Sequence, residues 1–430
     1  MAEDDNDRPE RPQRYRAPRG TSDLLPDEWP YWRHLRDTAE RVCESFGYQR
    51  IETPMFEHSG VFLRAAGAGT DIVEKEIYLF DDRGGDRMAL RPEGTPNAMR
   101  AYLENGMGSL PQPVRLYYIS PNFRYDRPQA GRHRQHTQFG AEAIGDGDAL
   151  VDAELIDLLR TFYGELGLSG LTLKVNSIGD AVCRPAYIER LRAYYRPQLD
   201  AVCADDRMRF EKNPLRLLDC KEDRCAPIIA GAPRLRDALC EPCRAHFDDL
   251  QRYLGALDIR FEVDDHLVRG FDYYTRTVFE FQPQEEGGQS TVGAGGRYDG
   301  LCELLGGPPT PGMGFGTGFE RLIINLKRQD APVPPPAATT LFIAHLTPEA
   351  AAQALRLAAA TRRAGHATVV GAAGRSLKAQ LRHADARGAR YSAIIGADEL
   401  AAGEVTLRDM QAHTERRVKV DDVPGALAIG

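Results

Sequence analysis

The spacing of apolar residues near the start of the chain predicts a long helix. Apolar side chains recur there at intervals of three and four, which places them on one face of a helix that ends at Gly47. They are Trp32, Leu35, Ala39, Val42 and Phe46. The run 48–53 is expected to be extended, because Pro54 disfavours helix in the residue before it. A further helix is predicted at 148–166 and a strand at 171–176.

A run of aromatic and β-branched residues predicts a β-hairpin after the first helix. Its first strand includes 114–119, its second runs from about 135 to 144, and a basic loop joins them. Side chains alternate along a strand, so Gln138 and Glu142 share one face of the second arm. If Arg124 on the first arm faces the same side, a guanidinium suited to phosphate lies near a carboxylate. The alternative is an edge hairpin with solvent-exposed ion pairs.

The segment before the hairpin carries two polar residues that suit a small cationic ligand. Glu93 and Thr95 are two positions apart at the end of a strand, so both can face one side and hold an ammonium group. Thr95 also has a structural interpretation, as the N-cap of a helix whose first residue is Pro96. The two interpretations are compatible, and both stay open.

Strand character resumes after a long helical region. The stretch 267–281 is expected to be a strand from about Asp272, because it is rich in β-branched and aromatic residues. Arg269 and Gly270 stand just ahead of it, where glycine lets a ligand or another backbone approach closely. A polar turn then leads to a glycine-rich strand within 291–300.

Alternate glycines at 312–318 form a further strand that runs directly into a helix from Phe319. A dinucleotide-binding loop would continue into a parallel βαβ unit, but the proline-rich run 331–336 follows instead. A strand without side chains leaves room for a flat ring, and Arg321 at the head of the helix can reach a phosphate.

The region 181–265 is rich in arginine and leucine and predicts a helical insertion. Four of its cysteines form a C-x4-C pair and a C-x2-C pair, which matches the ligand demand of one structural tetrahedral zinc site. The pairs are Cys220 with Cys225 and Cys240 with Cys243. The alternative is that these are ordinary buried cysteines on helices.

Composition and charge set the class of protein. The chain has 430 residues, of which 42% are hydrophobic and 27% charged, as in a soluble protein of two or three domains. No apolar run approaches the ~20 residues of a membrane span. The segment 1–16 lacks the apolar core of a signal peptide and is expected to be a disordered tail, so a cytoplasmic location with reduced thiols is expected. The net charge of −8 gives no sign of nucleic acid binding, so any RNA contact must come from local patches.

The C-terminal part alternates strands and helices behind a proline-rich linker at 331–338. Within it, 361–390 contains seven arginines or lysines and one aspartate, a basic patch that the net charge conceals. We expect 339–430 to be a small α/β domain. The basic patch is either an RNA-binding surface or a solvated helix face.

Three features together resemble the signature motifs of class II aminoacyl-tRNA synthetases. They are Pro54 after the first long helix, Arg124 in the basic hairpin and the glycine strand that ends in Arg321. The stretches 91–95, 267–280 and 291–300 resemble the histidine-specific elements of the histidyl-tRNA synthetase family. The most specific run is Arg269–Tyr274, in which Phe271 stands where family members often have leucine.

The resemblance covers the chain from Ala17 onward and implies its fold and partners. It implies an α+β protein with an antiparallel β-sheet catalytic domain at 17–330, flanked by helices and carrying the helical insertion. The α/β domain at 339–430 is then the anticodon-binding domain. A homodimer, with tRNA(His), L-histidine, ATP and Mg2+ as partners, is implied in the same way.

The resemblance also assigns roles to residues. Arg124 and Arg269 would hold the α-phosphate of ATP from two sides, and Arg321 the γ-phosphate, with Mg2+ on the pyrophosphate portion. Residues that would hold the α-ammonium of histidine are Glu93, Thr95 and Gln138. Those that would hold its imidazole are Glu142, Tyr274 and Tyr273, although core packing is the alternative for one tyrosine.

The tip of the hairpin is the part that the resemblance assigns to the acceptor end of tRNA. The residues concerned are Arg127, Gln129, Arg132 and Arg134, which would supply phosphate contacts as a group. Two rival functions remain at this level. One is the non-catalytic, synthetase-like regulatory subunit of the enzyme that starts histidine biosynthesis, and the other is a class II synthetase for a different amino acid.

Overall fold

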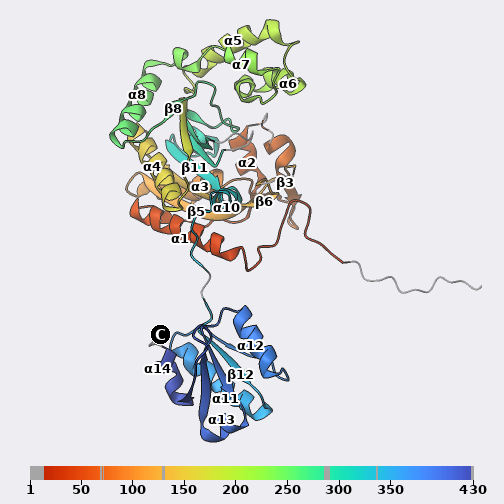
Figure 1. The fold of residues 1–430 in the computed structure, drawn as a ribbon. Coiled ribbons are helices and arrows are strands. Elements are labelled where there is room, and N and C mark those ends of the chain that lie inside the picture. The colour runs from red at the N-terminus through yellow and green to blue at the C-terminus, as the bar shows by residue number, and fades with distance from the viewer. Residues whose placement is uncertain are drawn as a thin grey trace, which may run out of the picture. The chain divides into compact units, whose positions relative to one another are not determined.

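The computed structural model describes residues 14–67, 70, 72–127, 131–284, 291–335 and 338–427. Gln129 and most of the expected N-terminal tail therefore lie outside the described residues. The chain forms two compact units, Met1–Val333 and Pro334–Gly430, and each is considered by itself (Figure 1).

The first unit is built on an eight-stranded sheet with the order β1-β5-β6-β11-β10-β9-β7-β8. Its strands are β1 (Gln49–Arg50), β5 (Val114–Phe123), β6 (Gln135–Ile144), β7 (Leu171–Ser177), β8 (Glu262–Val263), β9 (Thr275–Pro283), β10 (Gly293–Arg297) and β11 (Gly312–Gly318). Among the described strands, the outer pairs β1–β5 and β7–β8 are parallel, and the five pairings between them are antiparallel. The expected antiparallel sheet is confirmed.

One face of this sheet is apolar and covered by helices (Figure 1). The helices are α1 (Trp29–Ser45), α4 (Ala149–Glu165), α8 (Glu241–Ala256) and α10 (Phe319–Arg328). Alternate residues of the central strands pack beneath them, such as Phe139 and Ala141 of β6 and Phe315 of β11. The intervening residues of the same strands face the other side, which leaves that side free for polar chemistry.

The opposite side carries smaller elements and the helical segment that follows β7. Around the sheet lie α2 (Ser59–Ala66), η1 (Ile72–Glu76), α3 (Thr95–Glu104), η2 (Met107–Ser109) and α9 (Leu301–Leu304), with a small sheet β2-β4-β3 of Phe56–His58, Arg87–Leu90 and Tyr78–Asp81. The helical segment contains α5 (Arg184–Tyr195), η3 (Arg196–Gln198), α6 (Ala204–Lys212), η4 (Pro214–Asp219), α7 (Ala226–Ala230) and η5 (Leu235–Ala238). It shares a buried cluster with α3 and β5, so it packs directly on the sheet. The bounds 181–265 for an insertion remain a prediction.

The β5–β6 hairpin has the register that brings the expected polar faces together. Val114 pairs with Ile144 and Phe123 with Gln135, so Ser120 lies opposite Gln138 and Leu116 opposite Glu142. Paired residues share a face of an antiparallel sheet. The expectation that the two arms present one common polar face is therefore confirmed.

Two local expectations are wrong. Strand β9 begins at Thr275 rather than near Asp272, so Tyr273 and Tyr274 lie in the turn that precedes it. Arg276 has a positive φ, and the ladder with β7 ends there because that conformation interrupts an extended strand. Thr95 is the first residue of α3 and not its N-cap, because its hydroxyl points to another partner, described below.

The second unit has a five-stranded sheet with the order β13-β12-β14-β15-β16. Its elements are β12 (Leu341–His345), α11 (Pro348–Arg363), β13 (Thr368–Val370), α12 (Leu377–Ala386), β14 (Tyr391–Ile395), α13 (Ala397–Ala402), β15 (Glu404–Asp409), β16 (Glu415–Lys419), η6 (Val420–Asp422) and α14 (Val423–Leu427). Helix α11 packs on one face of the sheet and α12 on the other. Basic side chains of the α12 region, including Arg375, Lys378 and Arg382, are exposed. Within the described part of the chain, no helix combines the length and apolar character needed to cross a bilayer.

A buried ion pair joins the helix layer of the first unit to its sheet. The side chain of Arg297 at the end of β10 is fully buried, and its Nε lies 2.8 Å from Oδ1 of Asp152 on α4, which is also fully buried. Arg297 also donates to Asp299 and to the backbone oxygens of Asp146 and Asp148. A guanidinium cannot lose its proton in a protein, so this site depends on its carboxylates.

Replacing Asp152 with asparagine should lower the free energy of unfolding by about 3 kcal/mol, because a buried cation loses its nearest counter-charge. Asp157→Asn is the matched control, since Asp157 lies on the same helix and pairs with the half-exposed Arg160. The control should cost less than about 1 kcal/mol. Both losses are measurable by urea unfolding, since the chain's two tryptophans, Trp29 and Trp32, report on the first unit. Equal losses for the two variants would contradict the assignment.

Candidate active site

A cavity of about 410 Å³ lies on the polar side of the large sheet. Most of the polar residues singled out in the sequence line it, although they come from segments far apart in the chain. These are Glu93, Thr95, Arg124, Arg132, Gln138, Arg269, Tyr274 and Arg321. Glu142 and Tyr273 are almost fully buried and lie behind its wall. The fold thus gathers the predicted groups at one place, with two of them in supporting positions.

The carboxylate of Glu142 lies within a group of hydroxyls. Its Oε1 accepts hydrogen bonds from the hydroxyls of Thr95 at 2.8 Å and Tyr118 at 2.9 Å, and its Oε2 accepts one from Tyr298 at 2.5 Å. Burial raises the pKa of Glu142 to about 8, although these hydroxyls oppose the rise. Thr95 borders both Glu142 and the cavity, so it links the buried carboxylate to the space where a ligand would lie.

Glu93, unlike Glu142, borders the cavity itself. Its Oε2 accepts a 2.7 Å hydrogen bond from the hydroxyl of Tyr273. Burial raises the pKa of Glu93 to about 7, against the lowering effects of Arg124, Tyr273 and Arg269. The Tyr273 ring stacks on Phe271 with an interplanar angle of 14°. Tyr273 therefore contacts the site through Glu93, and its ring packs in the wall as the alternative interpretation expected.

The glycines of β11 make room for side chains of β6. Gly314 lies opposite Glu142, and a Cβ atom there would come within 1.8 Å of the Glu142 Oε2 atom. A Cβ at Gly316 would come equally close to Nε2 of Gln138. At Gly318, which lines the cavity, a Cβ would meet open space. The glycine run thus serves two purposes: it accommodates buried polar groups, and only at its end does it leave free surface for a ligand.

Arg269 is held by an acidic partner on β9. It forms an ion pair with Glu280, whose Oε2 also accepts from Gln282 and Thr291, both at 2.8 Å. Burial alone would raise the pKa of Glu280, but Arg269 and these two donors hold it below the usual range. The Nε of Arg269 is buried and has no hydrogen-bond partner among the described residues. A guanidinium held in this way retains a donor for an anionic ligand.

The remaining cationic groups of the cavity repel one another. Burial lowers the pKa of Arg321, and the nearby charges of Arg132 and Arg124 lower it further. His136 lies among them, and burial together with Arg124 and Arg321 lowers its pKa to about 3. His136 is therefore neutral at physiological pH and can accept or donate a hydrogen bond without adding charge. A polyanion in this cavity would relieve the repulsion among the arginines.

At the hairpin tip, the described residues differ in their surroundings. Arg127 is exposed, and Arg132 forms a 3.2 Å ion pair with Asp126. The guanidinium of Arg134 lies 3.7 Å from the centre of the Tyr125 ring, so this arginine packs within the hairpin. Gln129 lies outside the described residues.

The structure separates the four cysteines that were expected to share one zinc ion. Cys220 and Cys225 cluster with Cys203 and Asp206, whereas Cys240 and Cys243 cluster with Asp180 and Cys183. The sequence spacing suggested that the two pairs meet. Each pair instead lies beside one cysteine and one aspartate that are three positions apart earlier in the chain. The expected set of four ligands is therefore wrong.

Four residues of the candidate site escaped the sequence analysis. Tyr118 and Tyr298 bind Glu142, His136 lies between two arginines, and Glu280 anchors Arg269. The position of Tyr118 could have been inferred from the sequence, because pairing the two strands symmetrically about their loop places Tyr118 opposite Gly140. A Cβ atom at Gly140 would collide with the Tyr118 ring, so only glycine leaves room for it. The other three depend on contacts between distant strands, which spacing along the chain does not reveal.

Comparison with known proteins gives one consistent result. The model of the histidyl-tRNA synthetase family matches residues 20–322, and that of an anticodon-binding domain matches residues 340–428. A histidine–tRNA ligase from Dehalococcoides mccartyi is 50% identical over 409 residues, which is 95% of this chain and 98% of the relative.

Solved structures agree with these matches. The apo histidyl-tRNA synthetase of S. aureus superposes with a TM-score of 0.81 at 33% identity, covering 96% of this chain and all of the other. A Bacillus halodurans protein described as an ATP phosphoribosyltransferase regulatory subunit/histidyl-tRNA synthetase superposes at 0.61 and 22% identity, over 90% of this chain and 99% of its own. The second likeness shows the fold alone, so the fold by itself does not separate an enzyme from a regulatory subunit.

Glu142 should make the stability of the first unit depend on pH. Below pH ~4.5 the group is protonated in both states, and its stabilising contribution is fully present. As pH rises, the unfolded chain releases its proton first, so stability is lost until pH passes the folded pKa of about 8.

Glu142→Gln should remove this dependence. Between pH 5 and pH 8 the wild type should lose on the order of 2–3 kcal/mol more than the variant, measured by urea unfolding with tryptophan fluorescence. Glu104→Gln, at an exposed position on α3, should follow the wild type. Parallel pH profiles for wild type and Glu142→Gln would show that the carboxyl is not held protonated.

Proposed function

The chain belongs to the histidyl-tRNA synthetase family, and we propose that histidine and ATP react in the cavity on its large sheet. The chain is an aminoacyl-tRNA ligase for histidine. The observation that carries the assignment of the site is one cavity wall in which Glu93, whose pKa is raised, lies with several arginines. The buried Glu142, whose pKa is also raised, lies behind that wall. One group of residues suits an amino acid, and the other suits a triphosphate.

In the first step, a carboxylate oxygen of histidine attacks the α-phosphorus of ATP. A new O–P bond forms, the bond to the β-phosphate oxygen breaks, and pyrophosphate leaves with the electron pair. Negative charge gathers on the α-phosphate, so catalysis consists mainly of positioning and electrostatic stabilisation. Arg124 and Arg269 would hold that phosphate, and Arg269 is suited to it because its buried Nε still lacks a partner among the described residues.

We infer that the α-ammonium of histidine binds Glu93, Thr95 and Gln138, which share the cavity wall. An ammonium favours the ionised form of Glu93, so binding would release a proton near neutral pH, where its raised pKa leaves it partly protonated. The imidazole would lie between Tyr274 and Glu142, whose Oε2 accepts from Tyr298 and keeps a second lone pair. Tyr273 would act as a positioning residue through Glu93.

ATP would extend from the α-phosphate site toward Arg321 and the open surface at Gly318. The family implies Mg2+, which prefers carboxylate and phosphate oxygens. Glu320 lines the cavity, and its Oε2 is buried with no hydrogen-bond partner among the described residues, so it fits this requirement. Bound there with the nucleotide, Mg2+ would neutralise charge on the pyrophosphate as it leaves.

In the second step, a ribose hydroxyl at the 3′ end of tRNA(His) attacks the carbonyl carbon of the histidyl-adenylate. A C–O ester bond forms, the bond from that carbon to the phosphate oxygen breaks, and AMP leaves with the electron pair. We propose that Arg127 and Arg132, with Gln129, contact the acceptor end through its phosphates. In the second unit, which matches an anticodon-binding domain, the exposed Arg375, Lys378 and Arg382 are suited to RNA phosphates. Protein synthesis in the cytoplasm is the setting that this activity implies.

Pyrophosphate exchange into ATP tests the site, because it requires the amino acid and ATP but not tRNA. Exchange should depend on histidine, and no exchange with histidine would overturn the proposal, leaving the regulatory-subunit or other-amino-acid alternatives.

Glu142→Gln should raise the KM for histidine by about 100-fold and that for ATP by less than about threefold, since one buried hydrogen-bond partner is lost. Arg269→Ala should lower kcat by about 100-fold or more, since charge stabilisation is lost in the transition state.

Arg127→Ala is the matched control for the arginine variant. It should leave exchange unchanged and slow only the transfer to tRNA, because Arg127 is exposed at the hairpin tip. Equal effects of Glu142→Gln on histidine and ATP would contradict the division of the cavity.

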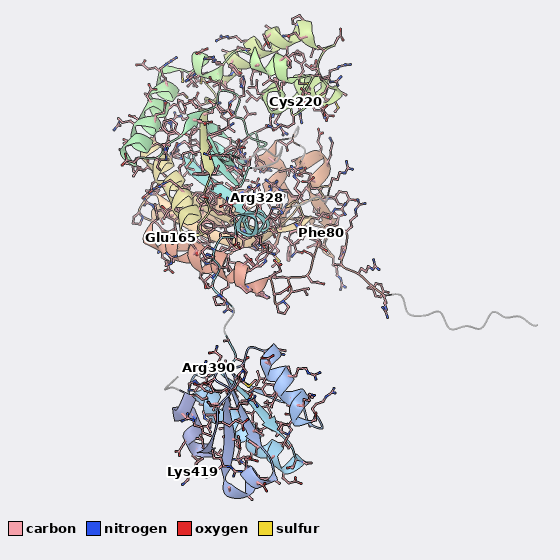
Figure 2. All side chains as sticks on the ribbon, viewed as in Figure 1. Phe80, Glu165, Cys220, Arg328, Arg390 and Lys419 are labelled. Atoms are coloured by element: carbon pink, nitrogen blue, oxygen red, sulfur yellow. The ribbon has the colours of Figure 1, made fainter. Side chains whose placement is uncertain are left out.

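We infer that the small sheet β2-β4-β3 forms the interface of a homodimer. Its register places Phe56, Phe80 and Met88 on one face, and Phe56 and Phe80 expose 56% and 39% of their surface (Phe80 is labelled in Figure 2). Exposed apolar groups that adjoin one another mark an association surface, and a twofold axis lets the same patch meet itself.

Phe56→Asp combined with Phe80→Asp should convert the dimer to monomers, because two charges would be buried at the interface. Leu257→Asp is the control, since Leu257 is 42% exposed at the end of α8, away from this sheet. Sedimentation velocity at micromolar concentration distinguishes the species. A dimer that persists in the double variant would place the interface elsewhere.

A further inference from the structure

Six of the chain's eight cysteines gather in two separate clusters, each with one aspartate. We propose that each cluster binds one structural zinc ion, so that the chain carries two. The first set of ligands is Asp180, Cys183, Cys240 and Cys243, and the second is Cys203, Asp206, Cys220 and Cys225. In each cluster the ligand atoms lie within 4.8 Å of one another.

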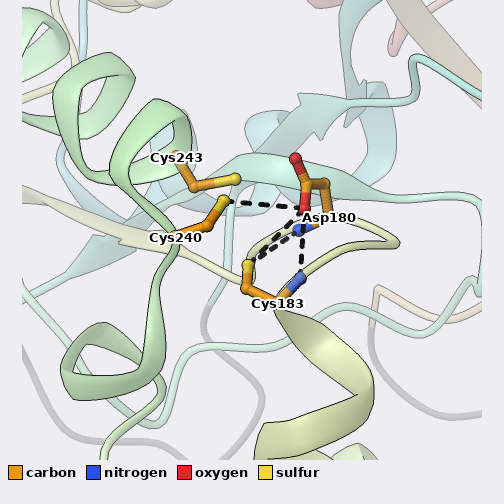
Figure 3. Close-up of side chains that lie close together, drawn as sticks. All are labelled: Asp180, Cys183, Cys240 and Cys243. Atoms are coloured by element: carbon orange, nitrogen blue, oxygen red, sulfur yellow. Dashed lines mark hydrogen bonds between the residues drawn. The ribbon is translucent and has the colours of Figure 1, made fainter.

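The first cluster has the spacing of a tetrahedral site (Figure 3). The Asp180 Oδ1 atom lies 3.6 Å from Sγ of Cys183 and 3.9 Å from Sγ of Cys240. Zinc–sulfur bonds of ~2.3 Å and zinc–oxygen bonds of ~2.0 Å at a tetrahedral angle separate oxygen and sulfur by about 3.5 Å. Figure 3 shows the four side chains pointing toward one another from the starts of α5 and α8. The distances therefore match a site that one ion could close with little movement.

The backbone around this cluster is shaped to hold it. Gly179 has a φ of +63°, and a Cβ there would come within 2.6 Å of the Cys183 Sγ, so glycine is required. Asp180 Oδ1 accepts from the backbone nitrogens of Val182 and Cys183, and Oδ2 lies 3.7 Å from Nη2 of Arg276. These contacts fix the carboxylate in place. Oδ1, the oxygen nearest the two thiols, already accepts two N–H groups, so a metal ion would replace the longer contact, the one from Cys183 at 3.4 Å, or bind Oδ2.

The second cluster repeats this arrangement. The Sγ atoms of Cys203 and Cys220 are 3.7 Å apart, close to the ~3.8 Å expected between two sulfurs on one tetrahedral zinc ion. Backbone N–H groups of Cys203 and Asp206 point at the Sγ atoms of Cys225 and Cys203, at 3.4 and 3.3 Å, and hold these sulfurs in place. A disulfide would need a sulfur separation of ~2.05 Å, so these are free thiols.

An unpartnered carboxylate oxygen supports the second site independently. Asp206 is completely buried, and its Oδ1 accepts from Arg209. Its other oxygen, Oδ2, is buried and makes no hydrogen bond within the described residues, and one of the two carboxylate oxygens belongs to the cluster. Leaving such an oxygen unsatisfied is costly, and a metal ion would satisfy it. Three thiolates with one carboxylate select zinc over harder cations such as Mg2+.

Each cluster lies on a helical element that contacts the turn before β9. Arg184, next to Cys183, donates through one Nη2 atom to the backbone oxygens of Gly179 at 2.9 Å and Tyr274 at 2.6 Å. Asn213, which ends the helix that Cys203 starts, donates to Asp272 at 2.5 Å. The two ions would thus fix the turn that carries Tyr273 and Tyr274 from both sides.

Metal content of the full chain, purified without chelator, tests the proposal. Elemental analysis should give about two zinc ions per chain for the wild type and for Cys302→Ser, a buried cysteine outside both clusters. Cys243→Ser and Cys225→Ser should each leave about one. If the wild type held one ion and each variant lost it, the cysteines would form one shared site. If the wild type held no zinc, they would be ordinary buried thiols. Either result would overturn the proposal.

Cobalt titration keeps the test decisive if a variant fails to fold. The wild-type chain, freed of metal by chelation under reducing conditions, should bind about two equivalents of Co2+ with thiolate-to-cobalt charge-transfer absorption. Saturation at one equivalent, or absence of the thiolate band, would contradict two thiolate-rich sites. This readout does not depend on aminoacylation, so it stands apart from the test of the proposed function.

Discussion

The first unit depends on the alternation of side chains along β6 and β11. Odd-numbered residues such as Phe139 and Phe315 pack under the helices, which forces Gln138 and Glu142 to the other face. A carboxylate buried at the centre of a sheet must find donors, and three hydroxyls from separate segments supply them. Its neighbour on β11 has to be glycine, since any side chain at Gly314 would occupy the same space. The burial of Glu142 thus determines the strand register, the position of the glycine and the placement of the three hydroxyls.

The cavity brings groups of like charge close together. Three arginines face one another while two carboxylates hold raised pKa values, so like charges meet and the carboxylates are partly neutral. An amino acid with ATP supplies the complementary groups, an ammonium for the carboxylates and phosphates for the guanidinium groups. In the proposed binding mode, each substrate changes the field that the other experiences, so the binding of the two should be coupled.

Sequence predicted the strands and the polar face of the hairpin because period-2 alternation and turn residues act locally. It also grouped the ligand-facing residues, although largely through resemblance rather than spacing. The cysteines show the limit: C-x4-C and C-x2-C were visible, but which pairs meet depends on how α5, α6 and α8 pack. The turn at Tyr273 and Tyr274 was predicted as strand, since aromatic residues favour strands and the left-handed Arg276 cannot be read from its type.

The position of that turn gives a structural role to the helical segment that lies between β7 and β8 in the chain. Tyr274 is not held by the β-ladder, because β9 begins one residue later. Its backbone oxygen is held by Arg184, and the neighbouring Asp272 is held by Asn213, both from the helical segment. The proposed contact of Tyr274 with the imidazole needs a fixed geometry, and a turn alone does not provide one. The helical segment therefore does for this turn what strand pairing does for Gln138 and Glu142. One cysteine cluster adjoins Arg184, and the other lies at the opposite end of α6 from Asn213.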